Sequence, residues 1–182
     1  MRCFVALDLP APVRNHLADV TATLRGDFDV RWVPADQLHV TLVFAGELPD
    51  ERASGLATLC REVELPPLSL ALTEFGWFPP RGAPRVLWAG VGGDVDALAA
   101  LQRTLAEGAA RLGVPREKRP FTPHVTLGRL KGPFGAHALV DRLRELSAAL
   151  RTKPFAPTAL VLYRSTLTPR GPRHDPLVHR AR

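Results

Sequence analysis

The same short motif places a histidine and a threonine in each half of the chain. The tetrapeptide His-Val-Thr-Leu occurs at residues 39–42 and again at 124–127, an offset of 85. Because side chains on an extended strand alternate between two faces, His39 shares a face with Thr41, and the second copy repeats this arrangement. Each copy therefore presents one imidazole beside one hydroxyl, with a valine and a leucine on the opposite face.

Two imidazoles and two hydroxyls suit in-line attack on a phosphate ester. Such attack needs a base that takes a proton from the nucleophile and an acid that protonates the leaving oxygen. Histidine, with an ordinary pKa near ~6.5, serves in either role. The hydroxyls can hold the other phosphate oxygens, so neither a metal ion nor another cofactor is expected. The residues assigned to this site are His39, Thr41, His124 and Thr126.

A single His-x-Thr on an apolar strand is more often a packing histidine than a catalytic one. The repetition favours function, because packing alone gives no reason for the pair to recur at an equivalent place of a duplicated unit. The other four histidines have no repeated counterpart, and we interpret them as surface or packing residues: His16, His137, His174 and His179.

The surroundings of the two motifs repeat as well. Each half is predicted to contain a strand, a helix, a proline-containing loop, the His-x-Thr strand, a second helix and an apolar strand. The first strand, the first helix and the last strand of the halves are expected at 2–9, 13–25 and 68–75, and at 85–91, 94–112 and 155–163. This constant order predicts two similar halves, about 1–80 and 85–165, within one domain of 182 residues.

Two further segments are predicted to be loops. Residues 78–84 and 168–176 are rich in Pro, Gly and Arg. The dipeptide at 177–178 is expected to form at most a short last strand. The order of strands and helices alone also allows a parallel α/β sheet.

Composition bounds the class of protein. With 46% hydrophobic and 23% charged residues the chain is typical of a globular domain. Its two cysteines, Cys3 and Cys60, exclude a disulfide framework and a four-cysteine zinc site. Apolar runs such as 68–72 are far shorter than the ~20 residues of a membrane span. Asp8 interrupts the first apolar run too early for a signal peptide, so we expect a cytoplasmic protein without a membrane partner.

Charge is distributed unevenly along the chain. Residues 1–115 carry ten basic and fourteen acidic side chains, whereas residues 116–182 carry fourteen basic and only four acidic ones. A basic surface attracts polyanions, which indicates nucleic acid or phosphate ligands. A solvated, arginine-rich surface would explain the same numbers.

These motifs resemble a known family. Two His-x-Thr motifs about eighty-five residues apart are similar to those of the two-histidine (2H) phosphoesterase superfamily. The opening Arg-Cys-Phe-Val-Ala-Leu-Asp-Leu-Pro at 2–10 and the run Phe-Thr-Pro-His-Val-Thr-Leu-Gly-Arg at 121–129 resemble its RNA 2′,3′-cyclic phosphodiesterase branch, also called the 2′-5′ RNA ligase-like family. The resemblance reaches Leu-Tyr-Arg-Ser-Thr-Leu at 162–167.

The resemblance implies both a fold and an activity. The fold would be α+β and bilobal, with two pseudo-symmetric halves whose mostly antiparallel sheets line a central cleft and whose helices lie outside. The activity would be metal-independent opening of a 2′,3′-cyclic phosphate at an RNA end, which leaves a 2′-phosphomonoester. By the same resemblance His39 is the proton donor and His124 the proton acceptor. Reversible 2′-5′ joining of RNA ends would use an alcohol in place of water.

Further residues are assigned to the substrate. The resemblance associates Arg129 with the phosphate, although a flat strand would turn it away unless a bulge at Gly128 re-aims it. Phe4, Phe121 and Tyr163 are candidates for stacking on a base, with core packing as the alternative for each.

Two other functions stay open at this point. One is a 2H phosphoesterase that acts on 2′-5′ oligonucleotides or small cyclic nucleotides. The other is an RNA-binding module without catalysis. For the favoured function, the expected partner is RNA with a 2′,3′-cyclic phosphate end, such as a tRNA fragment, and the protein is expected to be a monomer.

Overall fold

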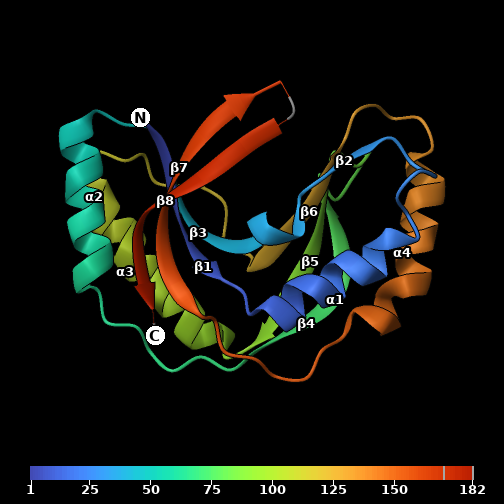
Figure 1. The fold of residues 1–182 in the computed structure, drawn as a ribbon, viewed down its shortest axis with the longest axis horizontal. Coiled ribbons are helices and arrows are strands. Elements are labelled where there is room, and N and C mark those ends of the chain that lie inside the picture. The colour runs from blue at the N-terminus through green and yellow to red at the C-terminus, as the bar shows by residue number, and fades with distance from the viewer. Residues whose placement is uncertain (170, 182) are drawn as a thin grey trace.

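Four helices and an eight-stranded sheet make up the computed structural model, which describes residues 1–169 and 171–181 (Figure 1). The strands are β1 (Arg2–Asp8), β2 (Val30–Trp32), β3 (His39–Glu47), β4 (Leu70–Phe78), β5 (Val86–Gly93), β6 (His124–Leu130), β7 (Ala159–Thr168) and β8 (Gly171–Ala181). The helices are α1 (Ala11–Ala22), α2 (Asp50–Glu62), α3 (Val95–Arg111) and α4 (Ala136–Leu150), with a 3₁₀ turn at Ala35–Gln37. All strand pairs between these elements are antiparallel, so the predicted α+β class is confirmed.

The sheet is divided into two wings that meet at β3 and β6. Its order is β4-β5-β6-β3-β1-β7-β8, with β2 also paired to β6. We call β3, β1, β7 and β8 the β1 wing, and β6, β5, β4 and β2 the β5 wing. At the junction, Val40 of β3 lies opposite Val125 of β6. Figure 1 shows the wings opening as a V, with α2 and α3 outside the β1 wing and α1 and α4 outside the β5 wing.

The two sequence halves exchange elements between the wings. β1 pairs with β3 of its own half and with β7 of the other half, and β5 pairs with β6 of its own half and with β4 of the other. Helix α3 of the second half packs against β3, while α1 of the first half packs against α4. Each wing is therefore built from both halves of the sequence.

The alternation predicted for the His-x-Thr strands is present in both copies. In β3 the side chains of Val40 and Leu42 are buried, while those of His39 and Thr41 are only partly buried. The same pattern holds at the start of β6. Burial of each such valine or leucine stabilises the fold by about 1.5–3 kcal/mol. We call the opposite face of the sheet, which carries the histidines, the inner face.

The prediction for residues 168–176 was wrong, whereas the short last strand expected at 177–178 is part of β8. Segment 168–176 is not a loop, because β7 extends to Thr168 and β8 begins at Gly171; residue 170 lies outside the described residues. The strand predicted at 155–163 correspondingly begins at Ala159. β8 is an edge strand paired only to β7, so it can accommodate its two prolines and needs no regular apolar alternation. Among the described helices, none is both long and apolar enough to cross a membrane.

Gly128 allows β2 to lie close to β6. A Cβ at this position would lie 2.6 Å from Cγ1 of Val30 and 3.1 Å from the carbonyl oxygen of Arg31. We expect Gly128→Ala to lower the free energy of unfolding by about 1–3 kcal/mol, because the added methyl group must push β2 away. Urea unfolding followed by circular dichroism measures this change.

Gly132→Ala is the matched control, since no atom lies within 4 Å of its added Cβ. We expect that variant to stay within about 1 kcal/mol of the parent protein. Equal stability of the two variants would contradict a close approach of β2 at Gly128.

Candidate active site

The two imidazoles are held in the same way. Nδ1 of His39 lies 2.7 Å from the carbonyl oxygen of Gln37, and Nδ1 of His124 lies 2.7 Å from the carbonyl oxygen of Thr122. A carbonyl oxygen only accepts, so Nδ1 carries the hydrogen in both rings. This arrangement leaves Nε2 of each histidine as the atom that can take up or release a proton.

Strand pairing brings the two motifs onto one face. Val40 opposes Val125 where β3 and β6 meet, and both valines are buried. Because adjacent side chains on a strand point to opposite faces, His39 and Thr41 of β3 and His124 and Thr126 of β6 all project from the inner face beside this junction. The structure thus brings all four predicted residues together, and the two histidines are close enough for the charge of His124 to lower the pKa of His39.

Aromatic rings surround each imidazole. The ring of Phe4 is stacked on His39 at 4.8 Å between centroids, and Tyr163 lies 5.9 Å from His39. The rings next to His124 were missed by sequence analysis: Phe78 lies at 5.3 Å and Trp88 at 5.9 Å. An available signal was the offset of 85 between Phe78 and Tyr163, since these two rings stand at equivalent places on β4 and β7.

The surroundings of His39 include a carboxylate. Asp8 lies opposite His39 in the register of β1 and β3, and its Oδ1 accepts a hydrogen bond of 2.5 Å from the hydroxyl of Tyr163. At the equivalent place, the residue opposite His124 is Gly90. The two histidines therefore differ in their electrostatic environment, although their backbone anchors are alike.

His174 also belongs to the surroundings of His39. Its ring lies 5.6 Å from that of His39 and 4.8 Å from that of Phe4, both edge to face. It was interpreted from sequence as a surface or packing residue, and it does pack here, but against a predicted catalytic histidine. Sequence analysis missed this proximity because His174 lies in the part of β8 that was predicted to be a loop, 168–176.

The environment of both histidines favours their neutral forms. The pKa of His39 is lowered to about 4, chiefly by burial and in smaller part by the positive charges of His174 and His124. The backbone carbonyl of Gln37 and the carboxylate of Asp8 oppose this shift. Burial also lowers the pKa of His124, and the carbonyl of Thr122 opposes this shift. In the free protein both Nε2 atoms are therefore acceptors near neutral pH.

A bulge in β6 places Arg129 on the inner face. Trp88 opposes Thr126 and Leu87 opposes Gly128, so Leu127 is the extra residue of β6. Beyond this bulge Arg129 lies on the same face as Thr126. The sequence analysis expected a bulge at Gly128 to be needed for this orientation. In β3 the corresponding bulge at Leu42 places Phe44, which is 56% exposed, at the position equivalent to Arg129.

The candidates for base stacking differ in their surroundings. Phe4 is only 4% exposed and its ring stacks on those of His39 and Tyr163. Phe121, by contrast, lines an open groove of about 410 Å³ together with Trp88 and Thr122. That groove begins next to His124, because its wall includes Gly90, which opposes His124 in the sheet.

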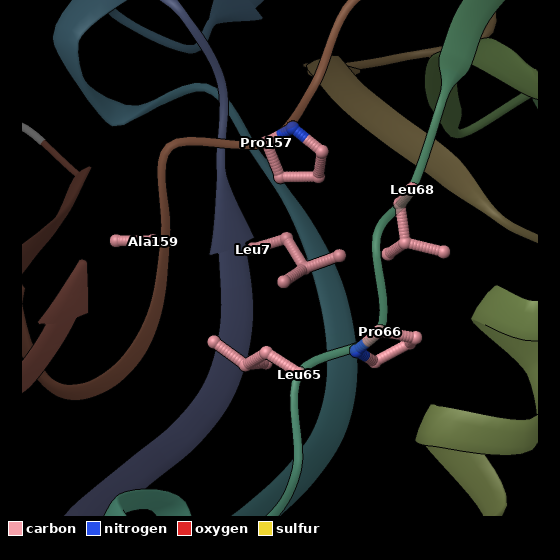
Figure 2. Close-up of a pocket in the computed structure, with 6 residues that line it drawn as sticks. All are labelled: Leu7, Leu65, Pro66, Leu68, Pro157 and Ala159. Atoms are coloured by element: carbon pink, nitrogen blue, oxygen red, sulfur yellow. The ribbon is translucent and has the colours of Figure 1, made fainter. Parts of the chain in front are cut away.

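A second hollow is apolar and lies away from the histidines. Figure 2 shows it between Leu7, Leu65 and Pro157, among other residues. Its volume of about 10 Å³ is that of a single water-sized space. The side chain of Leu7 belongs to the face of β1 opposite to that of Asp8, so this hollow is a packing gap on the outer face.

Comparison with known proteins places the chain in one family. Residues 9–168 match the model of the 2′-5′ RNA ligase superfamily. The chain belongs to this family. It is 33% identical to the RNA 2′,3′-cyclic phosphodiesterase of Thermotoga maritima over 94% of this chain and 90% of that protein. The Escherichia coli protein of the same name is 33% identical over 97% of this chain and 93% of its own length.

Solved structures of the same family have a similar fold. The crystal structure of E. coli LigT complexed with 3′-AMP is 32% identical, with a TM-score of 0.75 over 99% of this chain and 97% of that one. The crystal structure of TT0787 from Thermus thermophilus is 31% identical, with a TM-score of 0.76 over 100% of this chain and 97% of that one. The resemblance to 2H phosphoesterases stated from sequence is therefore confirmed.

The depressed pKa of His39 predicts how stability depends on pH. Between the ordinary pKa of 6.5 and about 4, the unfolded chain binds a proton at this position and the folded chain does not. The contribution of His39 to the free energy of unfolding should therefore be fully present above pH 6.5 and should decrease as the pH falls towards 4. Urea unfolding at several pH values measures it, and the His39→Gln variant should lose less stability across this window.

Titration of the His39 ring by NMR gives a direct measurement. We expect its Cε1 resonance to stay that of a neutral imidazole at pH 5.5 and to shift only near pH 4. His137→Gln, which changes an exposed histidine of α4, is the control for the stability curves. A His39 ring that titrates at 6.5 would contradict the burial argument.

Proposed function

We propose that this protein hydrolyses 2′,3′-cyclic phosphate ends of RNA to 2′-phosphomonoesters, with His39 as the proton donor and His124 as the proton acceptor. The observation that carries the proposal is the pair of imidazoles with anchored Nδ1 atoms and free Nε2 atoms on one face of the sheet. The names of the curated relatives, RNA 2′,3′-cyclic phosphodiesterase, support the choice of substrate.

The reaction follows from the positions of these groups. Nε2 of His124 takes a proton from a water molecule, and the water oxygen attacks the phosphorus on the side opposite to the 3′ oxygen. The bond between phosphorus and the 3′ oxygen breaks, and Nε2–H of His39 gives its proton to that oxygen. One water is consumed, and the phosphate remains on the 2′ oxygen as a monoester.

The remaining residues hold the phosphate during the attack. The hydroxyls of Thr41 and Thr126 flank the imidazoles and donate hydrogen bonds to the oxygens that do not leave. The Arg129 guanidinium, returned to the same face by the bulge, neutralises the charge that develops on them. The residues present complete these roles without a metal ion.

His39 acquires its proton together with the substrate. Free His39 is neutral at pH 7, because its pKa is lowered to about 4. A phosphate anion against the ring raises that pKa, since an opposite charge within a few ångströms favours the imidazolium. The Asp8 carboxylate acts in the same direction, and no carboxylate occupies the equivalent position beside His124. This asymmetry supports His39 as the proton donor.

The same site is suited to a second, reversible transfer in which RNA ends are joined. If an alcohol of a second RNA end replaces water, the transfer joins two RNA ends by a 2′-5′ bond, with the roles of the histidines unchanged. In the cell we propose RNA fragments, such as those of tRNA, as substrates. We also propose that residues 1–182 act as one monomeric, cytoplasmic phosphoesterase domain.

Incubation with defined RNA ends tests the proposed function. A short RNA with a 2′,3′-cyclic phosphate is incubated with the protein in EDTA, and ³¹P NMR identifies the monoester. We expect the 2′-phosphate alone. Faster turnover of small cyclic nucleotides or of 2′-5′ oligonucleotides would instead indicate the second type of 2H enzyme, and binding of RNA without turnover would indicate a binding module.

Alanine substitution should separate the two histidine roles. We expect His39→Ala and His124→Ala each to lower kcat by about 10²–10⁴-fold, as loss of one proton-transfer group does. The parent profile of kcat against pH, which reports the enzyme–substrate complex in which His39 is protonated, should be bell-shaped. His124→Ala should lose the limb that rises with pH, because a base must be deprotonated, and His39→Ala should lose the limb that falls, because an acid must be protonated.

His137→Ala serves as the control, since this histidine is exposed on α4 away from the site. It should leave kcat and both limbs unchanged. If either site variant keeps full activity, the paired-histidine mechanism is wrong, and if the limbs are exchanged, the donor and acceptor roles are reversed.

A further inference from the structure

Two arginines face each other on neighbouring strands of the β5 wing. In the pairing of β2 with β6, Arg31 lies directly opposite Arg129. Opposed residues share a face, so Arg31 lies on the inner face with Arg129. The burial pattern agrees, because Arg31 is exposed while Val30 before it is buried. The sequence analysis did not single out Arg31.

This arrangement is unfavourable without an anion. Like charges directly opposite each other on adjacent strands destabilise a sheet, and an arginine side chain stays charged at every working pH. Within residues 1–169 and 171–181, neither Arg31 nor Arg129 forms an ion pair with a carboxylate. The pair is thus a site of concentrated positive charge that an external anion would neutralise.

The backbone around the pair is built to keep the two arginines together. Gly128 lets β2 lie against β6, since any Cβ there would clash with Val30. On the opposite side, the β7–β8 hairpin of the other wing reaches Arg31, because a Cβ on Gly171 would lie 3.7 Å from Cδ of Arg31. The stem of Arg31 is therefore placed between the two wings.

Arg31 and Arg129 lie equally far along β6 from the His-x-Thr motifs, but their side chains have different neighbours. β3 pairs with β6 at Val125 and β2 pairs with it at Arg129, which are three positions apart on β5 because Leu127 is bulged. At 3.3 Å per residue this separation is roughly 10 Å. In the proposed site Arg129 reaches back along this span to the phosphate at the imidazoles, whereas the stem of Arg31 lies against Gly171 of the other wing, where it is available to a second phosphate.

We propose that Arg31 binds the next phosphate of the RNA chain, one nucleotide upstream of the cyclic phosphate that Arg129 and the histidines hold. This inference rests on the proposed function and adds a determinant of substrate length. A mononucleotide has no second phosphodiester and cannot use Arg31, whereas an oligonucleotide can. Arg31 therefore makes the enzyme prefer RNA ends to small cyclic nucleotides.

A comparison of two substrates tests the proposal. The kcat/KM of a four-nucleotide RNA with a 2′,3′-cyclic phosphate is measured beside that of 2′,3′-cyclic AMP, for the parent protein and for Arg31→Gln. We expect the ratio of the two values, RNA over mononucleotide, to fall about tenfold in Arg31→Gln, as loss of one charge-assisted contact does. Arg31→Lys should recover part of the ratio, because the charge remains.

Salt dependence provides a second readout that a structural role would not change. A plot of log kcat/KM against log salt concentration should be shallower by roughly 0.7 for RNA in Arg31→Gln, since one counterion fewer is released from a single strand. Arg103→Gln is the matched control, because it removes one charge from an exposed position of α3. It should leave the ratio and the slope unchanged.

The outcomes separate this proposal from the function on which it rests. An unchanged ratio in Arg31→Gln, or equal loss on both substrates, would overturn the role of Arg31. If the parent protein turns over neither substrate, the proposed function fails. In that case binding still tests Arg31. Fluorescence anisotropy measures the affinity for a labelled four-nucleotide RNA that ends in a 3′-phosphate, and competition measures the affinity for 3′-AMP. Loss of affinity for the RNA alone supports it, and unchanged affinity contradicts it.

Discussion

The pairing of β3 with β6 is the constraint on which the geometry of the site depends. Val40 and Val125 are fully buried at this junction, and the strands diverge into separate wings on either side of it. Because the pleat alternates with a period of two, burying these two valines fixes His39 and His124 on the opposite, inner face. A shift of one residue in either strand would bury one imidazole and expose a valine.

Within this duplicated frame, the two halves have diverged where the chemistry requires it. The nucleophile and the leaving group of a hydrolysis differ, so a proton donor and a proton acceptor need different environments. The carboxylate of Asp8 faces His39, whereas Gly90 faces His124. The position of Arg129 is held in the other half by Phe44. The symmetry of the backbone determines how the two imidazoles are placed relative to each other. The differing residues of the two halves determine the charge around each imidazole.

Much of the site could be predicted because its residues belong to short motifs that are recognisable within a few positions of the sequence. The repeated motif gave His39, and alternation along a strand gave its face. The possible bulge near Gly128 was inferred from the need to re-aim Arg129. Tertiary partners could not be inferred in this way. The exchange of β4 and β7 leaves no local signature, since each is an apolar strand that fits either wing. Of β8 only the dipeptide at 177–178 was expected to form a strand, because an edge strand needs no apolar alternation, and the proximity of His174 to His39 was missed for the same reason.

Because the two halves exchange their last strands, neither half can form its wing of the sheet without the other. β4 completes the wing that holds β5, and β7 completes the wing that holds β1, so neither repeat contains a closed set of hydrogen-bonded strands. In a chain that ended after the first repeat, β1 would lack its partner strand β7. β4 would lack its partner strand β5. Deletion of either half would remove the partner strand of the other. Single residues of this doubled architecture can therefore be changed, but it cannot be reduced to one half.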